Sequence, residues 1–261
     1  MYSATSGALV AQAAVDTIAN NLANVNTTGF KRTLLQVQSQ PESQLYRFQV
    51  DPGQVNGKRL SGVPTQQAIG ALGSGSQVYD TPAVYEQGAI ASTGNDLDVA
   101  LSGPGFFAIQ TGAGQLRYTR DGAFLRDQNG YLTAQNGDRV MGTSGNAIVI
   151  PNQGQVQIGR DGTVSVSGQT IDKLAVVEFA NTSALRPEGS NRFVDTGNSG
   201  AAAATNTSTL QGSVEKSNAD VVRSMVDLIS NERWFDANQK SIQTQDDAVA
   251  QAIQTVGRSN Q

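Results

Sequence analysis

The chain has 261 residues, a net charge of 18 − 22 = −4, and charged side chains at only 15% of its positions. It has no Lys/Arg-rich run, so neither nucleic acid nor anionic lipid is an expected partner. Cysteine and histidine are both missing, which excludes disulfides, thiolate nucleophiles, His-assisted serine chemistry and nearly all zinc and copper sites. The length allows one large core, or a medium core with further elements.

The N-terminus does not resemble a secretory leader. It lacks a basic n-region, and its longest apolar run, "ALVA", is too short for an h-region. No segment approaches the roughly 20 apolar residues of a membrane span. We therefore expect no membrane insertion, and any export without a cleaved Sec-type leader.

Residues 1–30 contain one charge, Asp16, and no proline. Their apolar residues follow a spacing of three and four that is typical of a coiled-coil seam. Gly29 is suited to the left-handed position after a helix, so a helix is predicted up to about that point. The seam positions are Ala4, Ala8, Ala11, Val15, Ile18, Leu22 and Val25.

This helix ends in "ANNLANVNTTGFKR", residues 19–32, which holds four asparagines although asparagine is a poor helix former. In the seam register Asn21 and Asn26 flank the seam, whereas Asn20 and Asn24 point away from it. The first pair is therefore a candidate for contacts with a packing partner, and the alternative is that all four amides are solvated.

Residues 33–76 lack a sustained period. The segment "PESQLYRFQVDPGQVNGKRLSGVP" mixes turn dipeptides with short apolar pieces, and "ALGSGSQ" is typical of a flexible joint. This region is predicted to be extended chain with one hairpin.

From about Gln77 to Phe193 the apolar residues recur with period 2. The strand candidates are "LDVAL", "FFAIQ", "LRYT", "AIVI", "VQI", "TVSVS" and "LAVVEF", and between them lie "TGAG", two "RDG" and two "QNG" turns. Asn-Gly and Asp-Gly pairs between alternating apolar residues are strong hairpin signals. We interpret this region as one antiparallel β domain.

"TGNSGAAAATNTST" (196–209) has the composition of a linker, and a helix is expected to begin near Ser217, where Ser217 and Asp220 match a capping box. Its first apolar residues cover an arc of about 160°, which is wider than one two-helix seam and indicates more than one packing neighbour. A strict seven-residue repeat follows at Val221, Leu228, Phe235, Ile242, Val249 and Val256.

Few residue patterns suggest chemistry. Asp96 and Asp98 would share one face of a strand and could serve as an acid and a base, but a turn-proximal surface pair is the favoured interpretation. The glycine clusters match no phosphate-binding motif, and Trp234 and Phe235 point about 100° apart on a helix, which favours two separate packing contacts. No catalytic residue, cofactor site or metal site is predicted.

Four stretches, in order, resemble one family. "ANNLANVNTTGFKR" is similar to the N-terminal signature of bacterial flagellar axial proteins, the basal-body rod and hook group. "QGAIASTGNDLDVALSGPGFFAIQT" and "YTRDGAFLRDQNGYLTAQNGDRVMG" resemble the family's β domain, and "LQGSVEKSNADVVRSMVDLISNERWFDANQKSIQTQDDAV" resembles its C-terminal helix. The resemblance covers nearly the whole chain except residues 33–75, which depart from the rod pattern.

The resemblance implies a structural subunit and not an enzyme. In that family the terminal helices form the inner tube of a hollow axial structure, the β domain faces outward, and export uses the flagellar type III apparatus. A self-assembling rod subunit in the flagellar basal body, outside the cytoplasmic membrane, is therefore expected, with copies of itself and other rod and hook proteins as partners. It would transmit torque from motor to hook. In a crowded tube, neutral amides such as Asn21 and Asn26 would fix helix register at a lower desolvation cost than charges.

Two alternatives stay open at this point, a hook or hook-associated subunit and a carbohydrate- or peptidoglycan-binding β module on a helical stalk. The expected class is α+β, with N- and C-terminal coiled-coil-forming helices flanking a central antiparallel all-β domain. The expected segments are an axial helix (1–32), an extended joint (33–76), the β domain (77–205) and a second axial helix (206–261). The residues expected at subunit interfaces are Val15, Ile18, Asn21, Leu22, Val25, Asn26, Val221, Met225, Leu228, Ile229, Phe235, Ile242 and Val249.

Overall fold

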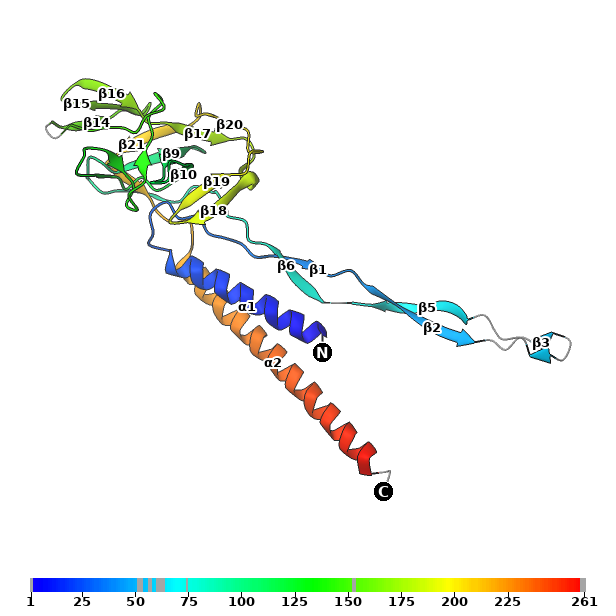
Figure 1. Ribbon diagram of the computed structural model, residues 1–261. Coiled ribbons are helices and arrows are strands. Elements are labelled where there is room, and N and C mark those ends of the chain that lie inside the picture. Colours follow the sequence, from blue (N-terminus) through cyan, green and yellow to red (C-terminus); the bar gives the residue numbers. More distant parts are fainter. Residues whose placement is uncertain are drawn as a thin grey trace. The chain divides into compact units, whose positions relative to one another are not determined.

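The computed structural model describes residues 2–50, 54–55, 58–59, 64–73, 75–151 and 154–258. One helix near each end flanks a strand-rich region, and every strand pair among the described residues is antiparallel, so the fold is α+β as expected (Figure 1). The chain forms two compact units. Unit 1 comprises Met1–Asp16, Leu35–Asp80 and Leu228–Gln261, and unit 2 comprises Thr17–Leu34 and Thr81–Asp227. The four-segment division made from the sequence stays a prediction.

The N-terminal helix α1 covers Tyr2–Ala23. The prediction placed its end near Gly29, but hydrogen-bonded turns replace the helix after Ala23, where the Val25 amide donates to the Leu22 carbonyl. Val25 and Asn26 therefore follow the helix instead of lying on its face. Asparagine competes for backbone hydrogen bonds, which favours such an early end.

The described residues between 36 and 80 form a long two-stranded ribbon in unit 1, which confirms the expected hairpin. Strand β1 (Gln36–Ser39) pairs with β6 (Ser76–Asp80), and β2 (Ser43–Val50) pairs with β5 (Pro64–Leu72). The short strands β3 (Gln54–Val55) and β4 (Lys58–Arg59) pair with each other. The "ALGSGSQ" segment lies at the β5–β6 connection.

Unit 2 contains the β domain. Its largest sheet has nine strands, three smaller sheets accompany it, and a short 3₁₀ helix covers Thr182–Ala184. The nine strands are β9 (Phe106–Gln110), β10 (Leu116–Thr119), β11 (Leu125–Arg126), β12 (Leu132–Thr133), β13 (Arg139–Val140), β17 (Val176–Phe179), β18 (Leu185–Gly189), β19 (Arg192–Asp195) and β20 (Ala201–Ala203). The smaller sheets are β14 (Val156–Ile158) with β15 (Thr163–Val166) and β16 (Gln169–Lys173), β8 (Val99–Ser102) with β21 (Ser208–Gln211), and β7 (Ile90–Ser92) with β22 (Ser213–Glu215).

Strand β9 lies between two cores, because its alternate residues point to opposite faces. Phe107 and Ile109 belong to one core, which also receives Val156 and Val164 from the three-stranded sheet. Phe106 belongs to the second core with Phe179, Phe193 and Tyr85, where aromatic rings meet edge to face at centroid distances of 5.3–5.8 Å. A strand buried on both faces reads as a continuous apolar run, here "FFAI".

The predicted linker at 196–209 is wrong. Ala201–Ala203 pair with Val177–Phe179, and Ser208–Gln211 pair with Val99–Ser102, so this segment belongs to the β domain. Small residues resemble a linker in composition, yet a β-edge strand needs only backbone groups to pair. "AIVI" (147–150) forms isolated bridges rather than a strand, and the other strand candidates are confirmed at their centres.

The C-terminal helix α2 covers Val221–Arg258. The predicted capping box is wrong by three residues. The Asp220 carboxylate accepts from the Arg223 amide at 2.8 Å, which makes Asp220 the N-cap, whereas Ser217 accepts from the Ala219 amide in the preceding turn. Within the described part of the chain, neither helix has the length and apolar character needed to cross a membrane.

Gly29 is buried with φ +66°, and its amide donates to the Glu215 carbonyl at 2.8 Å. A Cβ atom there would lie 2.3 Å from the Asp121 amide nitrogen, whereas one at Gly137, which has φ +86°, would meet nothing within 4 Å. We predict that Gly137→Ala costs about 1 kcal/mol of unfolding free energy from backbone strain alone. Gly29→Ala should cost at least about 3 kcal/mol, because the clash adds to that strain. Urea unfolding of both variants checks this, and equal losses would contradict it.

Candidate functional site

One side of α2 is half-buried from Ser224 to Gln245, and the other positions from 221 to 254 are exposed. From 221 to 254 the half-buried positions are spaced alternately by four and three residues, which is the period of a helix-packing stripe. Apolar and amide side chains alternate along the part of the stripe in unit 1. The half-buried residues are Ser224, Leu228, Asn231, Phe235, Asn238, Ile242 and Gln245.

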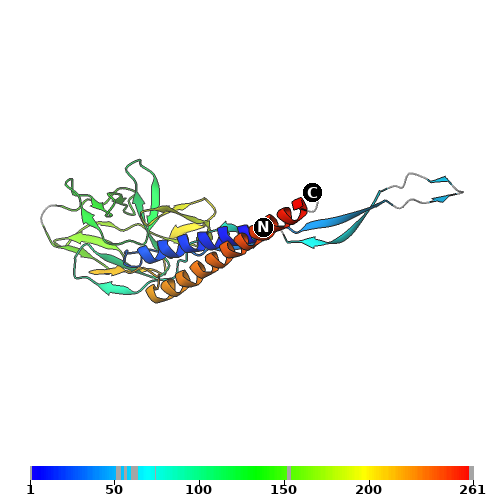
Figure 2. The same cartoon turned by 90° about the horizontal axis from the view of Figure 1, so that it is seen from below.

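Within unit 1 this stripe faces the first half of α1, and Figures 1 and 2 show the two helices side by side in both views. A Cβ atom on the buried Gly7 would lie 3.1 Å from the Asn238 carboxamide oxygen, so glycine leaves room for the amide. On the ribbon side, the Ser76 amide donates to the Ser6 hydroxyl at 3.3 Å. The N-terminal half of α1 is therefore packed on two sides, and Val10 and Ala11 are buried.

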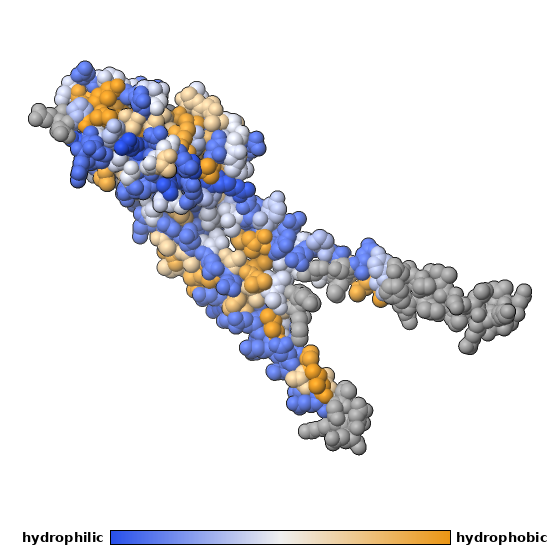
Figure 3. Space-filling view, viewed as in Figure 1, coloured by the Kyte–Doolittle hydropathy of each residue, from blue (hydrophilic) through white to orange (hydrophobic). Residues whose placement is uncertain are grey.

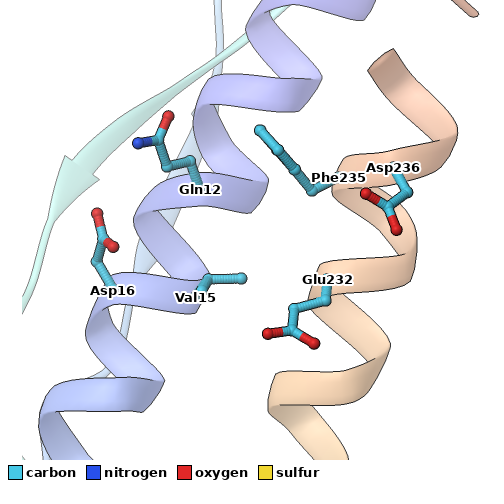
Figure 4. Close-up of a pocket in the computed structure, with 6 residues that line it drawn as sticks. All are labelled: Gln12, Val15, Asp16, Glu232, Phe235 and Asp236. Atoms are coloured by element: carbon cyan, nitrogen blue, oxygen red, sulfur yellow. The ribbon is translucent and has the colours of Figure 1, made fainter. Parts of the chain in front are cut away.

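A groove of about 450 Å³ lies between the helices of unit 1. Figure 4 shows Val15 pointing from α1, and Phe235 and Glu232 pointing from α2, into the gap, while Gln12 and Asp16 point away from it. The groove thus has an apolar floor and carboxylates at its margin, but it holds no arrangement of groups for chemistry.

A second face of α2 carries large apolar side chains that the chain itself leaves exposed. Val222 is 73% exposed and Ile229 is 51% exposed. The space-filling view shows such apolar surface at intervals along the helical part of the molecule (Figure 3). A series of this length on one helix marks an interaction surface. Its members, here called the apolar face of α2, are Val221, Val222, Met225, Val226 and Ile229.

In unit 2 a buried ion cluster lies where the segment after α1 and the segment before α2 reach the β domain. The Lys31 ammonium donates to Glu215 Oε1 at 2.6 Å and to the Glu86 carbonyl at 2.6 Å. Arg120 Nη1 lies 3.3 Å from Glu215 Oε2, and the Gly88 amide donates to Oε1 at 2.8 Å. The Lys31 and Glu215 side chains are completely buried and that of Arg120 almost so.

Arg120 is held from a second side. Its guanidinium lies 4.7 Å from the centre of the Phe106 ring, so it connects the ion cluster to the aromatic core by a cation–π contact. Burial lowers the pKa of Lys31 and the pKa of Arg120, and the Glu215 carboxylate opposes both shifts. The Glu215 carboxylate therefore favours the charged form of both side chains against the effect of burial.

Two amide side chains connect the helices to the same region. Asn21 is buried, donates from Nδ2 to the Thr33 carbonyl at 2.8 Å, and accepts from the Thr33 amide at 2.9 Å. Asn218, just before α2, accepts from the Arg32 amide at 2.7 Å and donates to the Val84 carbonyl at 2.8 Å. Each amide acts as a surrogate backbone group that pairs with extended chain.

The structure brings some of the sequence-predicted interface residues onto packed surfaces and leaves others exposed. Asn21 is buried against Thr33 of its own chain, and Asn26 is exposed after the helix. The half-buried members are Val15, Ile18, Leu22, Val25, Leu228, Phe235 and Ile242, and the exposed ones are Val221, Met225, Ile229 and Val249. Their role in contacts between subunits stays a prediction.

The candidate carboxylate pair does not form a catalytic site. Asp98 is buried and accepts from the Thr93 hydroxyl at 2.6 Å and from the Asn95 amide at 3.0 Å, whereas Asp96 is exposed. Asp98 thus closes a turn instead of forming the expected surface pair. The described residues include no group of three or more acidic side chains placed to hold a metal ion.

Sequence reasoning missed the ion cluster. Lys31 and Arg120 are separated from Glu215 by 184 and 95 residues, so no local spacing connects them. The one available signal was the scarcity of charge, because Lys31 follows thirty residues that contain a single charged side chain. A lysine in such a neutral, structured segment requires a partner if it is buried.

Comparison with known proteins identifies relatives along the whole chain. Residues 1–31 match the family described as "Flagella basal body rod protein", residues 100–166 match "Flagellar hook protein FlgE/F/G D1 domain", and residues 210–255 match "Flagellar basal body rod FlgEFG protein C-terminal".

Individual relatives agree with these matches. The flagellar basal-body rod protein FlgG of Bacillus subtilis is 36% identical over 97% of each chain. The FlgG protein of Borreliella burgdorferi is 33% identical over 94% of each chain. The rod protein FlgF of Caulobacter vibrioides is 30% identical and covers 100% of this chain and 98% of its own.

We predict that Phe235→Ala destabilises the helix pair of unit 1 by about 1–3 kcal/mol, because it removes a half-buried ring from the stripe. The neighbouring Trp234, which is 48% exposed, provides the control, and Trp234→Ala should change stability by less than about 0.5 kcal/mol. Hydrogen exchange of the α1 amides in the monomer measures both effects. Equal loss of protection would contradict the assignment of the stripe.

A second prediction concerns Asp121, which accepts from the Thr28 hydroxyl at 2.7 Å. Burial raises its pKa above 3.8, outweighing that hydrogen bond, so the native state holds the proton more tightly than the unfolded chain. Stability contributed by this group therefore falls as pH rises above about 4. Relative to Asp121→Asn, the wild type should lose unfolding free energy as the pH rises from about 4 in urea titrations. A relative gain over that rise in pH would contradict the sign.

Proposed function

This chain belongs to the flagellar rod and hook family of axial proteins, and from that membership we propose that it is a structural subunit of the basal-body rod. Members of this family are structural proteins and not enzymes. The relatives reported above are all named rod proteins, and they match this chain over nearly its full length, which favours the rod over the hook.

The apolar face of α2 is the observation that supports assembly through the helices. A helix of 38 residues with a half-buried stripe on one side and exposed apolar residues on another has more apolar surface than one partner helix covers. Copies of this chain, packed helix against helix as coiled coils in a tube, would bury that face. The same arrangement would put the β domain on the outside.

Partners follow from this proposal. The subunit would contact copies of itself and other rod and hook proteins, reach its site through the flagellar type III apparatus, and transmit torque from motor to hook. In a tube the β domain links to the helices through the ion cluster and through Asn21 and Asn218. Within unit 2, these contacts would transmit torque between the β domain and the chain segments that adjoin it at the end of α1 and the start of α2.

Three of the four amides of "ANNLANVNTTGFKR" fall into two groups under this proposal, while Asn24 donates to the Asn20 carbonyl of its own helix at 2.9 Å. Asn21 serves its own chain, since both ends of its carboxamide pair with Thr33. Asn20 and Asn26 are exposed and would be available to neighbouring subunits. The register role proposed for Asn21 therefore acts within the chain, by fixing where the strand leaves the helix.

Electron microscopy of basal bodies from the source bacterium tests the proposal. A strain lacking this protein should assemble the membrane-embedded base but lack the distal rod and hook, because axial subunits assemble in sequence. An intact rod in that strain would contradict a rod function, and a complete rod without a hook would indicate a hook subunit instead.

Complementation of that strain tests the apolar face of α2. Ile229→Lys should fold as a monomer yet fail to restore rods, because burying an unpaired ammonium between helices is costly. Gln239→Lys introduces the same charge at an exposed polar position of α2 and should restore rods more fully. Circular dichroism of the purified monomers confirms that both variants keep their helices. Normal rods with Ile229→Lys would contradict assembly through this face.

A further inference from the structure

The ion cluster of unit 2 contains two cations and one anion. Lys31 and Arg120 both point at the Glu215 carboxylate, and Glu215 is among the largest fully buried side chains. The nearby Glu86 carboxylate is mostly exposed and lies 3.8 Å from Arg32, so it faces solvent. Within the buried cluster the net charge is therefore +1.

Arg120 uses only part of its hydrogen-bonding capacity. Its Nε atom is buried and has no hydrogen-bond partner in the structure. Buried donors without partners are rare, because each loses its hydration. Glu215 is thus the one buried carboxylate that pairs with the two cations among the described residues, beside the Glu86 carbonyl on Lys31 and the Phe106 ring on Arg120.

Glu215 reaches the cluster from the last strand of the β domain. Strand β22 pairs with β7, and β21 pairs with β8. The Glu215 carbonyl accepts from the Gly29 amide, and the next residue, Lys216, donates from its amide to the Ala89 carbonyl at 2.8 Å. The same short segment therefore completes the β7–β22 and β8–β21 strand pairs and supplies the carboxylate that pairs with both cations.

We propose that Glu215 is an electrostatic latch, which closes last in folding and makes the native β domain conditional on the arrival of the C-terminal segment. Contacts across 184 and 95 residues close long loops, so they form after local hairpins such as β9–β10 and β14–β15. Before Glu215 arrives, Lys31 and Arg120 can only be buried as unpaired charges, which opposes closure.

The proposal predicts that removing the carboxylate lowers the stability of the protein far more than removing one of the two cations. Glu215→Gln keeps the side-chain volume but leaves two cations unpaired, so the folding equilibrium constant should fall on the order of 10²–10³-fold. Lys31→Met leaves Arg120 and Glu215 as a neutral pair, and its folding constant should stay within about tenfold of wild type. Lys31→Met should also restore part of the stability of Glu215→Gln, because it removes one of the unpaired charges.

Stopped-flow folding and unfolding of the full chain test the order of closure. In Glu215→Gln the unfolding rate constant should carry nearly the whole change, with the folding rate constant altered by less than about threefold. If Glu215→Gln does not fold, the same comparison is made in the Lys31→Met background, with and without Glu215→Gln.

Val214→Ala is the matched control. It lies on the same strand and is buried, but it removes no charge. Its effect should add to that of Lys31→Met within about twofold, whereas the effects of Lys31→Met and Glu215→Gln should be strongly coupled. The latch is overturned if Lys31→Met and Glu215→Gln are equally damaging and uncoupled, or if Glu215→Gln slows folding in proportion to its loss of stability.

Discussion

The buried carboxylate of Glu215 is the constraint on which the rest of unit 2 depends. It contacts a lysine that follows the first helix, an arginine that packs on the aromatic core, and the backbone before strand β7. Three chain segments thus meet at one side chain that has no exposure to water. Because a buried charge must be paired, any displacement of those segments that separates these groups is costly.

The same region explains the unusual neutrality of the N-terminal helix. Polar contacts here are made by amides that imitate the backbone, namely Asn21 on Thr33 and Asn218 on Arg32 and Val84. An amide satisfies one donor and one acceptor without adding a charge. The segment that follows α1 is held by Asn21, and the segment that precedes α2 is held by Asn218. The ion pair of Lys31 and Glu215 joins the same two segments.

Local patterns predicted the local structure well. The apolar period of α1, the seven-residue repeat through Leu228, Phe235 and Ile242, and the Asn-Gly and Asp-Gly hairpins are short-range signals, and the structure places helices and hairpins there. The ion cluster could not be predicted from local patterns, because its members are distant in sequence. The edge strand Ala201–Ala203 was mistaken for a linker, since backbone pairing leaves no trace in alanine side chains. Asp220 displaced Ser217 as the cap because both residues are good caps and only tertiary contacts choose between them.

The stripe on α2 also limits how the helix can slide. Leu228, Phe235 and Ile242 alternate with Asn231, Asn238 and Gln245, so a displacement by one turn places amides where apolar side chains were. A matching pattern returns only after seven residues, which is about 10 Å along the axis. Between those positions the packing energy of the helix is higher, because amides and apolar side chains exchange their sites. A helix with this stripe therefore has packed positions only about 10 Å apart along its axis. An axial load must drive it over the energy barrier between two such positions before it can slide.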